Sequence, residues 1–250
     1  MNLQYFFTYK DKLPPGVGFD LFGLEHIITL AIGISVVFFI CIKYYRADPD
    51  TRRKTDRIIG SRLFIAYFII YYCAKLISIG KPDPNEAPLH LCRIIGLLCI
   101  LHSFKTYTWL EQVLYTMGIP GAMSALLFAD WNMYPAFSFW PILANIFHFG
   151  ILLYILLQLI SHRITPHLRY VWTVAVFIGI ILPPIYLYNK KFGTNFLFIN
   201  YPSPGSPLEM FEQKLGNPGY ILPFVIVTFA IIFIMELMAE GVIRYKSKRK

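Results

Sequence analysis

Cys92 and His148 are the two residues of this sequence best suited to covalent chemistry. Each lies a short way into an apolar segment that we expect to cross a membrane, residues 88–104 for Cys92 and 141–160 for His148. A thiol becomes a nucleophile when a nearby base takes its proton. His90 is a poor partner for Cys92, because residues two apart on a helix do not face each other. His148 comes from another segment at a similar depth, so it can face the thiol.

Further polar residues share the same outer half of the predicted bundle. Ionisable side chains inside a membrane are costly and commonly mark functional sites. We expect Arg93 and Lys75 to bind a phosphate, and Asn145 or His90 to donate a hydrogen bond to an oxyanion. The predicted substrate-binding residues are Glu25, His26, Lys75, His90, Arg93 and Asn145.

Each of these residues also has a structural interpretation. A cysteine in an apolar helix is commonly an inert small hydrophobe, and His148 could bond to another helix. Arg93 and Glu25 could form an ion pair. His26, His90 and His148 could bind a metal, but the sequence has no metal-ligand spacing such as HExxH,. We therefore expect neither a metal nor a cofactor.

The composition indicates an integral membrane protein. Of the 250 residues, 56% are hydrophobic and 15% are charged, and the mean hydropathy is +0.55. A soluble domain of this size cannot bury so much apolar surface. The composition excludes a soluble globular enzyme, a disordered chain and a disulfide-rich secreted module. The net charge of +9 does not indicate a nucleic-acid partner, because the basic residues lie mostly between apolar segments, where they set membrane topology.

We predict a single all-α membrane domain over residues 1–250, with about seven transmembrane helices. Each apolar segment approaches the roughly 20 residues that a helix needs to cross a bilayer. Lys and Arg are concentrated in the loops on one face, which predicts an outside N-terminus and an inside C-terminus. The predicted spans are residues 21–42, 58–79, 88–104, 109–128, 141–160, 170–188 and 220–238.

Two of these spans contain residues that interrupt helices. Gly118, Pro120 and Gly121 lie in the middle of the fourth span, and Pro183 and Pro184 lie late in the sixth. The backbone groups that such residues free need other partners. The pattern predicts either an interior cavity in a packed bundle or simple kinks. The longest loop, residues 189–219, is predicted to be external, where it either caps a site or only connects two spans.

The sequence Pro-Leu-His-Leu-Cys at residues 88–92 resembles the signature of the YwaF family of bacterial multi-pass membrane proteins. The Gly-rich residues 118–127, the aromatic loop at 130–140 and His148 are similar to the pattern of that family. The resemblance implies a relationship to eukaryotic acyltransferases of ether-linked phosphatidylethanolamines, and to membrane hydrolases that pair a Thr with a His. Carried over by motif, Cys92 is the nucleophile and His148 is the general base. The resemblance also implies a bacterial plasma membrane and phospholipid partners.

Together these features predict a lipid acyltransferase or acyl hydrolase. The Cys92 thiolate attacks an acyl ester of a phospholipid near the outer leaflet, and a second lipid or water takes the acyl group. Gly96, one turn below Cys92, is expected to leave room for an acyl chain. A transporter for a small anionic solute is one alternative, and a non-catalytic sensor or assembly partner is another. A transporter needs a polar path through both halves, whereas His102, Glu111 and Glu236 are scattered in the inner half.

Overall fold

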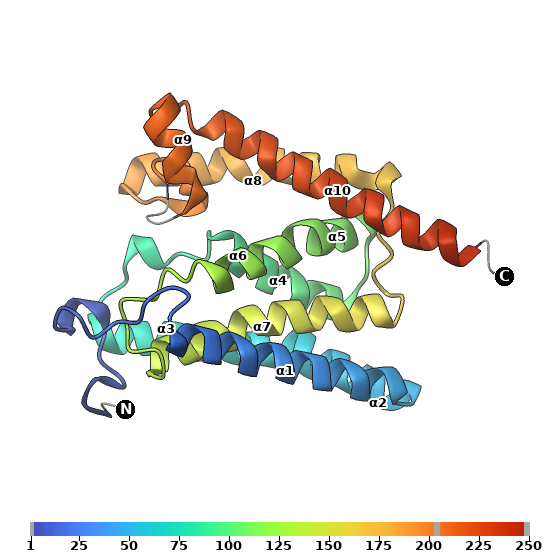
Figure 1. Ribbon diagram of the computed structural model, residues 1–250, viewed down its shortest axis with the longest axis horizontal. Helices are drawn as coiled ribbons and strands as arrows, with labels where there is room; N and C mark the ends of the chain where they lie inside the picture. Colours follow the sequence, from blue (N-terminus) through green and yellow to red (C-terminus); the bar gives the residue numbers. More distant parts are fainter. Residues whose placement is uncertain (1–2, 203–205, 248–250) are drawn as a thin grey trace.

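The computed structural model describes residues 3–202 and 206–247, and every regular element among them is helical (Figure 1). Two π-helical segments, η3 (Ile58–Leu63) and η5 (Leu114–Gly118), interrupt the α-helices. The α-helices are α1 (Leu24–Arg46), α2 (Pro49–Arg57), α3 (Phe64–Ile79), α4 (Leu91–Phe104), α5 (Thr108–Val113), α6 (Ile119–Leu127), α7 (Phe139–Ile160), α8 (Val171–Phe192), α9 (Pro207–Leu215) and α10 (Ile221–Ser247). The predicted all-α class is confirmed.

Five helical segments are long and apolar enough to cross a membrane. They are Leu24–Arg46, Pro49–Ile79, Phe139–Ile160, Leu168–Phe192 and Ile221–Gly241. The predicted span at 88–104 corresponds to α4, whose 14 residues extend about 21 Å, less than the roughly 30 Å of a hydrocarbon core. The predicted span at 109–128 is divided into α5, η5 and α6. The structure therefore supports five of about seven predicted spans, and the orientation stays a prediction.

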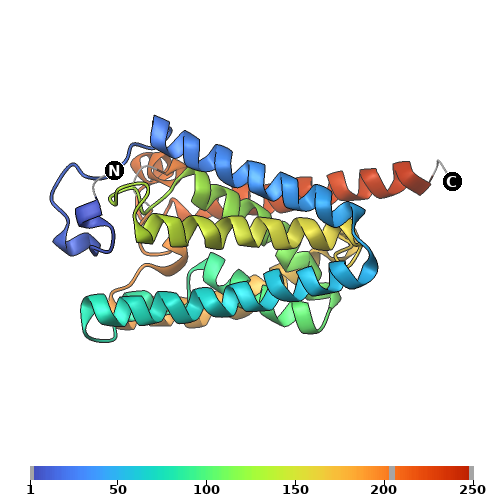
Figure 2. The same cartoon turned by 90° about the horizontal axis from the view of Figure 1, so that it is seen from below.

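Helix α7 lies at the centre of the molecule. It contacts α1, α3, α4 and α6, and it is the most buried of the five long apolar segments. Figure 1 shows α8, α9 and α10 together on one side of the bundle, with α1, α3 and α7 on the other. We call the end at which α4 and α7 begin the outer end, and the end at which they finish the inner end. Helix α10 extends past the other helices at the inner end (Figure 2).

Local sequence signals fix several helix ends. The Asp48 side chain accepts hydrogen bonds from the backbone N–H groups of Asp50 and Thr51, both at 3.0 Å, and so caps the start of α2,. Gly80, with a φ of 76°, ends α3, and Gly193, with a φ of 66°, ends α8. Both glycines are in the left-handed conformation that side chains disfavour.

The predicted interruption of the fourth span is confirmed, whereas that of the sixth is not. The π-helical segment η5 ends two residues before Pro120, which lies in the first turn of α6. Proline has no N–H to continue the helical ladder, so the backbone must change its hydrogen-bond pattern there. Pro183 and Pro184 lie inside α8, and the helix continues through them to Phe192.

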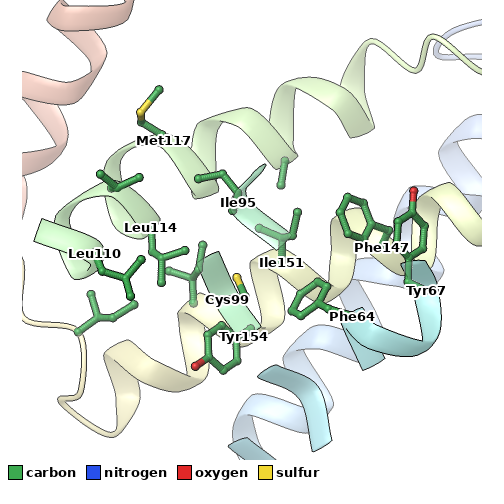
Figure 3. Packing of buried hydrophobic residues seen from close by; sticks show 14 of the residues in the cluster. Phe64, Tyr67, Ile95, Cys99, Leu110, Leu114, Met117, Phe147, Ile151 and Tyr154 are labelled. Carbon is green, nitrogen blue, oxygen red and sulfur yellow. The ribbon is translucent and has the colours of Figure 1, made fainter. Parts of the chain in front are cut away.

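The main hydrophobic core forms where α3, α4, η5 and α7 meet (Figure 3). Phe64, Ile95, Cys99, Ile151 and Tyr154 are completely or almost completely buried there. Ile95 and Cys99 face the core from α4, and Ile151 and Tyr154 face it from α7. These side chains form an apolar layer between the outer and inner ends of the two helices.

Gly96 lies against this core and does not face open space. A Cβ atom at Gly96 would lie 2.9 Å from Cε2 and Cζ of Phe147. The Phe147 ring is itself buried and stacks on Tyr67 with the ring centroids 3.9 Å apart. The expectation that Gly96 leaves room for an acyl chain is therefore wrong, because the Phe147 ring fills that space.

A second group of polar side chains lies at the inner end. The buried Asp56 carboxylate accepts hydrogen bonds from Tyr44 Oη at 2.9 Å and from Gln158 Nε2 at 2.8 Å, and it pairs with Arg163 Nη1 at 3.2 Å. His102 Nδ1 lies 2.8 Å from Tyr154 Oη. The sequence placed His102 among scattered polar residues of the inner half. The structure instead joins it to Tyr154. We call this group the inner polar cluster: Tyr44, Asp56, His102, Tyr154, Gln158 and Arg163.

Candidate functional site

Three side chains converge on the Glu86 carboxylate at the outer end. Lys75 Nζ donates to Oε1 at 2.7 Å, and Arg93 Nη2 donates to Oε2 at 3.2 Å. The Tyr71 hydroxyl also donates to Oε2, and Lys75 Nζ donates to Tyr9 Oη at 2.9 Å. Both residues that we predicted to bind a phosphate are therefore paired with a carboxylate of the protein. Glu86 was not singled out in the sequence analysis.

The surroundings of Glu86 and Lys75 stabilise the charged form of each side chain. Burial raises the pKa of the Glu86 carboxyl, but Lys75, Tyr71 and Arg93 outweigh it, and the net shift lowers the pKa,. The Lys75 ammonium also lies over three aromatic rings, 4.2 Å from the centroid of Tyr9, 5.1 Å from Trp140 and 5.3 Å from Tyr71. Such cation–π contacts stabilise a desolvated ammonium.

Cys92 is the second residue of α4 and lies at an uncapped helix start. The N-cap residue His90 makes no side-chain capping hydrogen bond, and the first bond of the helix runs from Ile94 N to His90 O at 3.1 Å. The N–H groups in the first turn of a helix have no carbonyl partner within that helix. Cys92 is partly buried at the edge of the main core, whereas Cys99 is fully buried.

His148 is held with one ring nitrogen bonded and the other free. It is 9% exposed, and its Nδ1 lies 2.8 Å from the Ala144 carbonyl oxygen. Because a carbonyl only accepts, Nδ1 carries the proton and Nε2 carries the lone pair. Nε2 has no hydrogen-bond partner in the part of the chain that the structure describes. Trp131 stacks on the imidazole with the centroids 5.0 Å apart, and the Phe147 ring packs at 5.3 Å.

The two predicted catalytic residues lie on helices that contact each other. Helix α4 packs on α7, and Gly96, one turn below Cys92, touches the ring of Phe147, the residue before His148. Within the described residues the thiol and the imidazole are not hydrogen-bonded to each other. The structure thus brings the two helices together and leaves Nε2 of His148 free to accept a proton.

Asp130, in the loop between α6 and α7, lies within electrostatic range of Cys92 and Arg93. Burial raises the pKa of the Asp130 carboxyl, and the positive charges of Arg93 and Lys10 oppose that rise. The side chain nevertheless keeps an exposed surface. Its only signal in the sequence was its place in an aromatic loop.

The structure does not bring Glu25 or His26 to Cys92. His26 is buried, its Nδ1 accepts from the N–H of Phe22 at 2.9 Å, and its Nε2 donates to the Leu126 carbonyl at 2.8 Å. Both ring nitrogens are used, so His26 joins the start of α1 to the end of α6. Glu25 is exposed on α1. The alternative of an Arg93–Glu25 ion pair is wrong, since Arg93 pairs with Glu86.

His90 and Asn145 lie near the outer end but make other contacts. The His90 ring packs against Phe196 at 4.7 Å and Phe198 at 6.1 Å, so the segment after α8 covers the start of α4. Asn145 Nδ2 donates to Pro141 O at 2.8 Å on its own helix. Among the described residues, no three His, Cys, Asp or Glu side chains are grouped as metal ligands.

The apolar helices, with charged networks buried at both ends, define a multi-pass helical membrane protein. A family model, that of the TMEM164 family, matches residues 21–236. The chain therefore belongs to the TMEM164 family. No curated protein and no solved structure matches it.

This finding corrects the resemblance drawn from the sequence. The assignment to the YwaF family is wrong, because the family that matches is TMEM164. The assignment rested on a five-residue motif and on hydropathy. The motif is too short, and hydropathy is too general, to separate families of apolar helical proteins. The bacterial plasma membrane and the relationship to ether-lipid acyltransferases were inferred from that resemblance alone, so both inferences lose their support.

Proposed function

We propose that this protein transfers acyl groups from membrane phospholipid esters through a thioester on Cys92, to a second lipid or to water, with His148 as the general base. The observation that carries the proposal is the state of His148. Its proton is fixed on Nδ1 by the Ala144 carbonyl, and Nε2, on a side chain that is 9% exposed, has no hydrogen-bond partner among the described residues. His26, which joins α1 to α6, instead uses both of its ring nitrogens.

The proposed reaction proceeds in two steps. His148 Nε2 takes the proton of Cys92, and Sγ attacks the ester carbonyl carbon. The C–S bond forms, the ester C–O bond breaks, and the leaving oxygen takes the proton back from Nε2. An acceptor hydroxyl or water then gives its proton to Nε2 and attacks the thioester, and the departing sulfur is reprotonated. The free N–H groups at the first turn of α4 are suited to stabilise the oxyanion.

The position of Cys92 favours a lipid ester as the substrate. Ester groups of phospholipids lie at the boundary between the polar headgroups and the hydrocarbon core. Cys92 lies at the start of an apolar helix, between a charged network on one side and the main hydrophobic core on the other. A substrate with a polar headgroup, an ester and an apolar chain fits this change of environment.

The arrangement of the core favours an enzyme over a transporter. Ile95, Cys99 and Ile151 are almost completely buried between the polar groups of the outer end and the inner polar cluster. A transporter needs polar groups along the whole path of its solute. In the part of the chain that the structure describes, this layer separates the two polar groups, as expected for a site that works from one leaflet.

The proposal is tested by acyl transfer from a labelled phospholipid in detergent micelles. We expect Cys92→Ala and His148→Ala each to lower the rate by more than about 100-fold, the usual scale for a nucleophile or a general base. Cys73→Ala, at an exposed cysteine, and Cys99→Ala, at a buried one, should keep the rate. Full activity of Cys92→Ala would refute the proposal.

A further inference from the structure

The Arg93 guanidinium bonds to four acceptors of the protein. Nη1 donates to the backbone carbonyls of Glu86 at 3.0 Å and Ala87 at 3.1 Å. Nη2 donates to the Tyr71 hydroxyl and to Glu86 Oε2, the latter at 3.2 Å. The guanidinium carbon lies 4.5 Å from the centroid of the Tyr71 ring. All four N–H groups of the two terminal nitrogens are thus matched by acceptors.

These four acceptors lie around the start of α4. Glu86 and Ala87 belong to the turn just before this helix, Arg93 is in its first turn, and Tyr71 is on α3. Arg93 therefore joins the entry of α4 to α3 across the chain that leads to Cys92. His90 supplies no cap at this helix start, so Arg93 and its partners are the polar contacts that hold it in the described residues.

Binding a substrate phosphate through the terminal nitrogens would require Arg93 to give up these contacts. Two of the acceptors are backbone carbonyls, which would lose their partner at a mostly buried position. An unpaired buried acceptor costs about 1–3 kcal/mol, and an unpaired buried charge costs more. The Glu86 carboxylate already fills the role that a phosphate oxygen would take.

We propose that Arg93 is a positioning residue, and that Glu86 and Tyr71 hold it in place. The inference rests on the proposed function. Arg93 fixes the path of the chain into α4 and thereby the position of the Cys92 sulfur relative to His148 on α7. It acts through Cys92 and does not touch the lipid.

The test separates two properties of the side chain at position 93, its positive charge and its planar hydrogen-bonding shape. Arg93→Lys keeps the positive charge, but an ammonium cannot bridge two carbonyls, a hydroxyl and a carboxylate in one plane. We expect Arg93→Lys and Arg93→Gln both to lower kcat by about 10- to 100-fold with KM for the phospholipid unchanged, since small misplacements of a nucleophile cost that much. Arg62→Lys, at an exposed arginine of η3, is the matched control and should change neither constant.

Tyr71→Phe and Glu86→Gln extend the test with milder changes, since neither removes the two backbone carbonyls that Arg93 binds. Tyr71→Phe removes one oxygen, and we expect kcat to fall about 10-fold with KM unchanged. The double variant Arg93→Lys with Glu86→Gln should be no slower than the slower single variant, because the residues act as one unit.

A different pattern would overturn the inference. If Arg93→Lys keeps kcat while Arg93→Gln raises KM, Arg93 binds the substrate by its charge. If Glu86→Gln lowers KM and keeps kcat, Glu86 competes with a substrate anion and does not hold Arg93. These outcomes leave the proposed function intact, whereas activity of Cys92→Ala refutes the function itself, so the two failures are distinguishable.

Discussion

At the scale of the residue, the surroundings of each side chain decide which cysteine and which histidine can react. Cys92 lies at an uncapped helix start, while Cys99 is fully buried in the core. His148 keeps one free nitrogen, while His26 uses both. The sequence predicted Cys92 and His148 from their depth and type. It could not predict the tautomer of His148, which depends on a carbonyl one helical turn away.

The partners of Arg93 and Lys75 were also beyond prediction from the sequence. Glu86 lies in a loop, and the direction of a loop side chain is not encoded by helical periodicity. The structure shows that this carboxylate faces into the bundle and binds both cations. The predicted phosphate site is thus occupied by a residue whose type was visible but whose direction was not.

The Glu86 network predicts a specific loss of stability in acid. Its carboxyl pKa is lowered in the folded protein, below the usual value of about 4.3 for the unfolded chain. The folded state therefore gains stability from the ionised form above about pH 4.3, and this gain is lost as the pH falls through the folded pKa. We expect the difference in thermal transition between the wild type and Glu86→Gln to be large at pH 7 and to shrink below pH 4.

Asp83→Asn is the control for this measurement, because Asp83 precedes the same turn and its pKa is lowered chiefly by the Asn85 backbone. It should keep the acid response that Glu86→Gln loses. A difference between the wild type and Glu86→Gln that is constant from pH 7 to pH 3 would contradict the ionised network.

At the scale of the element, the helices pack closely at Gly96, where the small residue had suggested open space. A glycine on an apolar helix is compatible with a void or with a ring pressed against it, and the sequence does not distinguish the two. The structure places the Phe147 ring against Gly96. In contrast, the break near Pro120 was predictable, because a missing N–H changes the backbone whatever surrounds it,.

Gly96→Ala tests this packing. The new Cβ would lie 2.9 Å from the Phe147 ring, which is held by stacking on Tyr67. We expect a loss of about 1–3 kcal/mol from overpacking, partly offset by the better helix propensity of alanine. Gly179→Ala, at a helical glycine with no atom within 4 Å of a Cβ, should be neutral or stabilising by up to about 1 kcal/mol. A lower thermal transition in Gly179→Ala than in Gly96→Ala would contradict this view of the core.

At the scale of the whole molecule, two polar groups lie at opposite ends of an apolar core. The all-α class followed from composition, because so apolar a chain can satisfy its backbone in a membrane by forming helices. The inner polar cluster did not follow, since Asp56 comes from the short α2 and Arg163 from a loop after α7. Contacts between residues this distant in sequence depend on how the helices pack.

The separation of the two polar groups supports a reaction at the outer end. Cys92, His148 and the Glu86 network all lie on the outer side of the layer of Ile95, Cys99 and Ile151. The matched family covers residues 21–236 and so includes both polar groups. The central claim is that the Cys92 sulfur carries the acyl group between its donor and its acceptor.

The most direct test is the intact mass of the protein after incubation with a phospholipid of one defined acyl chain. We predict a mass increase equal to one acyl group less one hydrogen, removed by hydroxylamine as expected for a thioester. The adduct should persist in Cys99→Ala and be absent from Cys92→Ala. An adduct of the same yield on Cys92→Ala, or no adduct on the wild type while acyl transfer proceeds, would contradict the account.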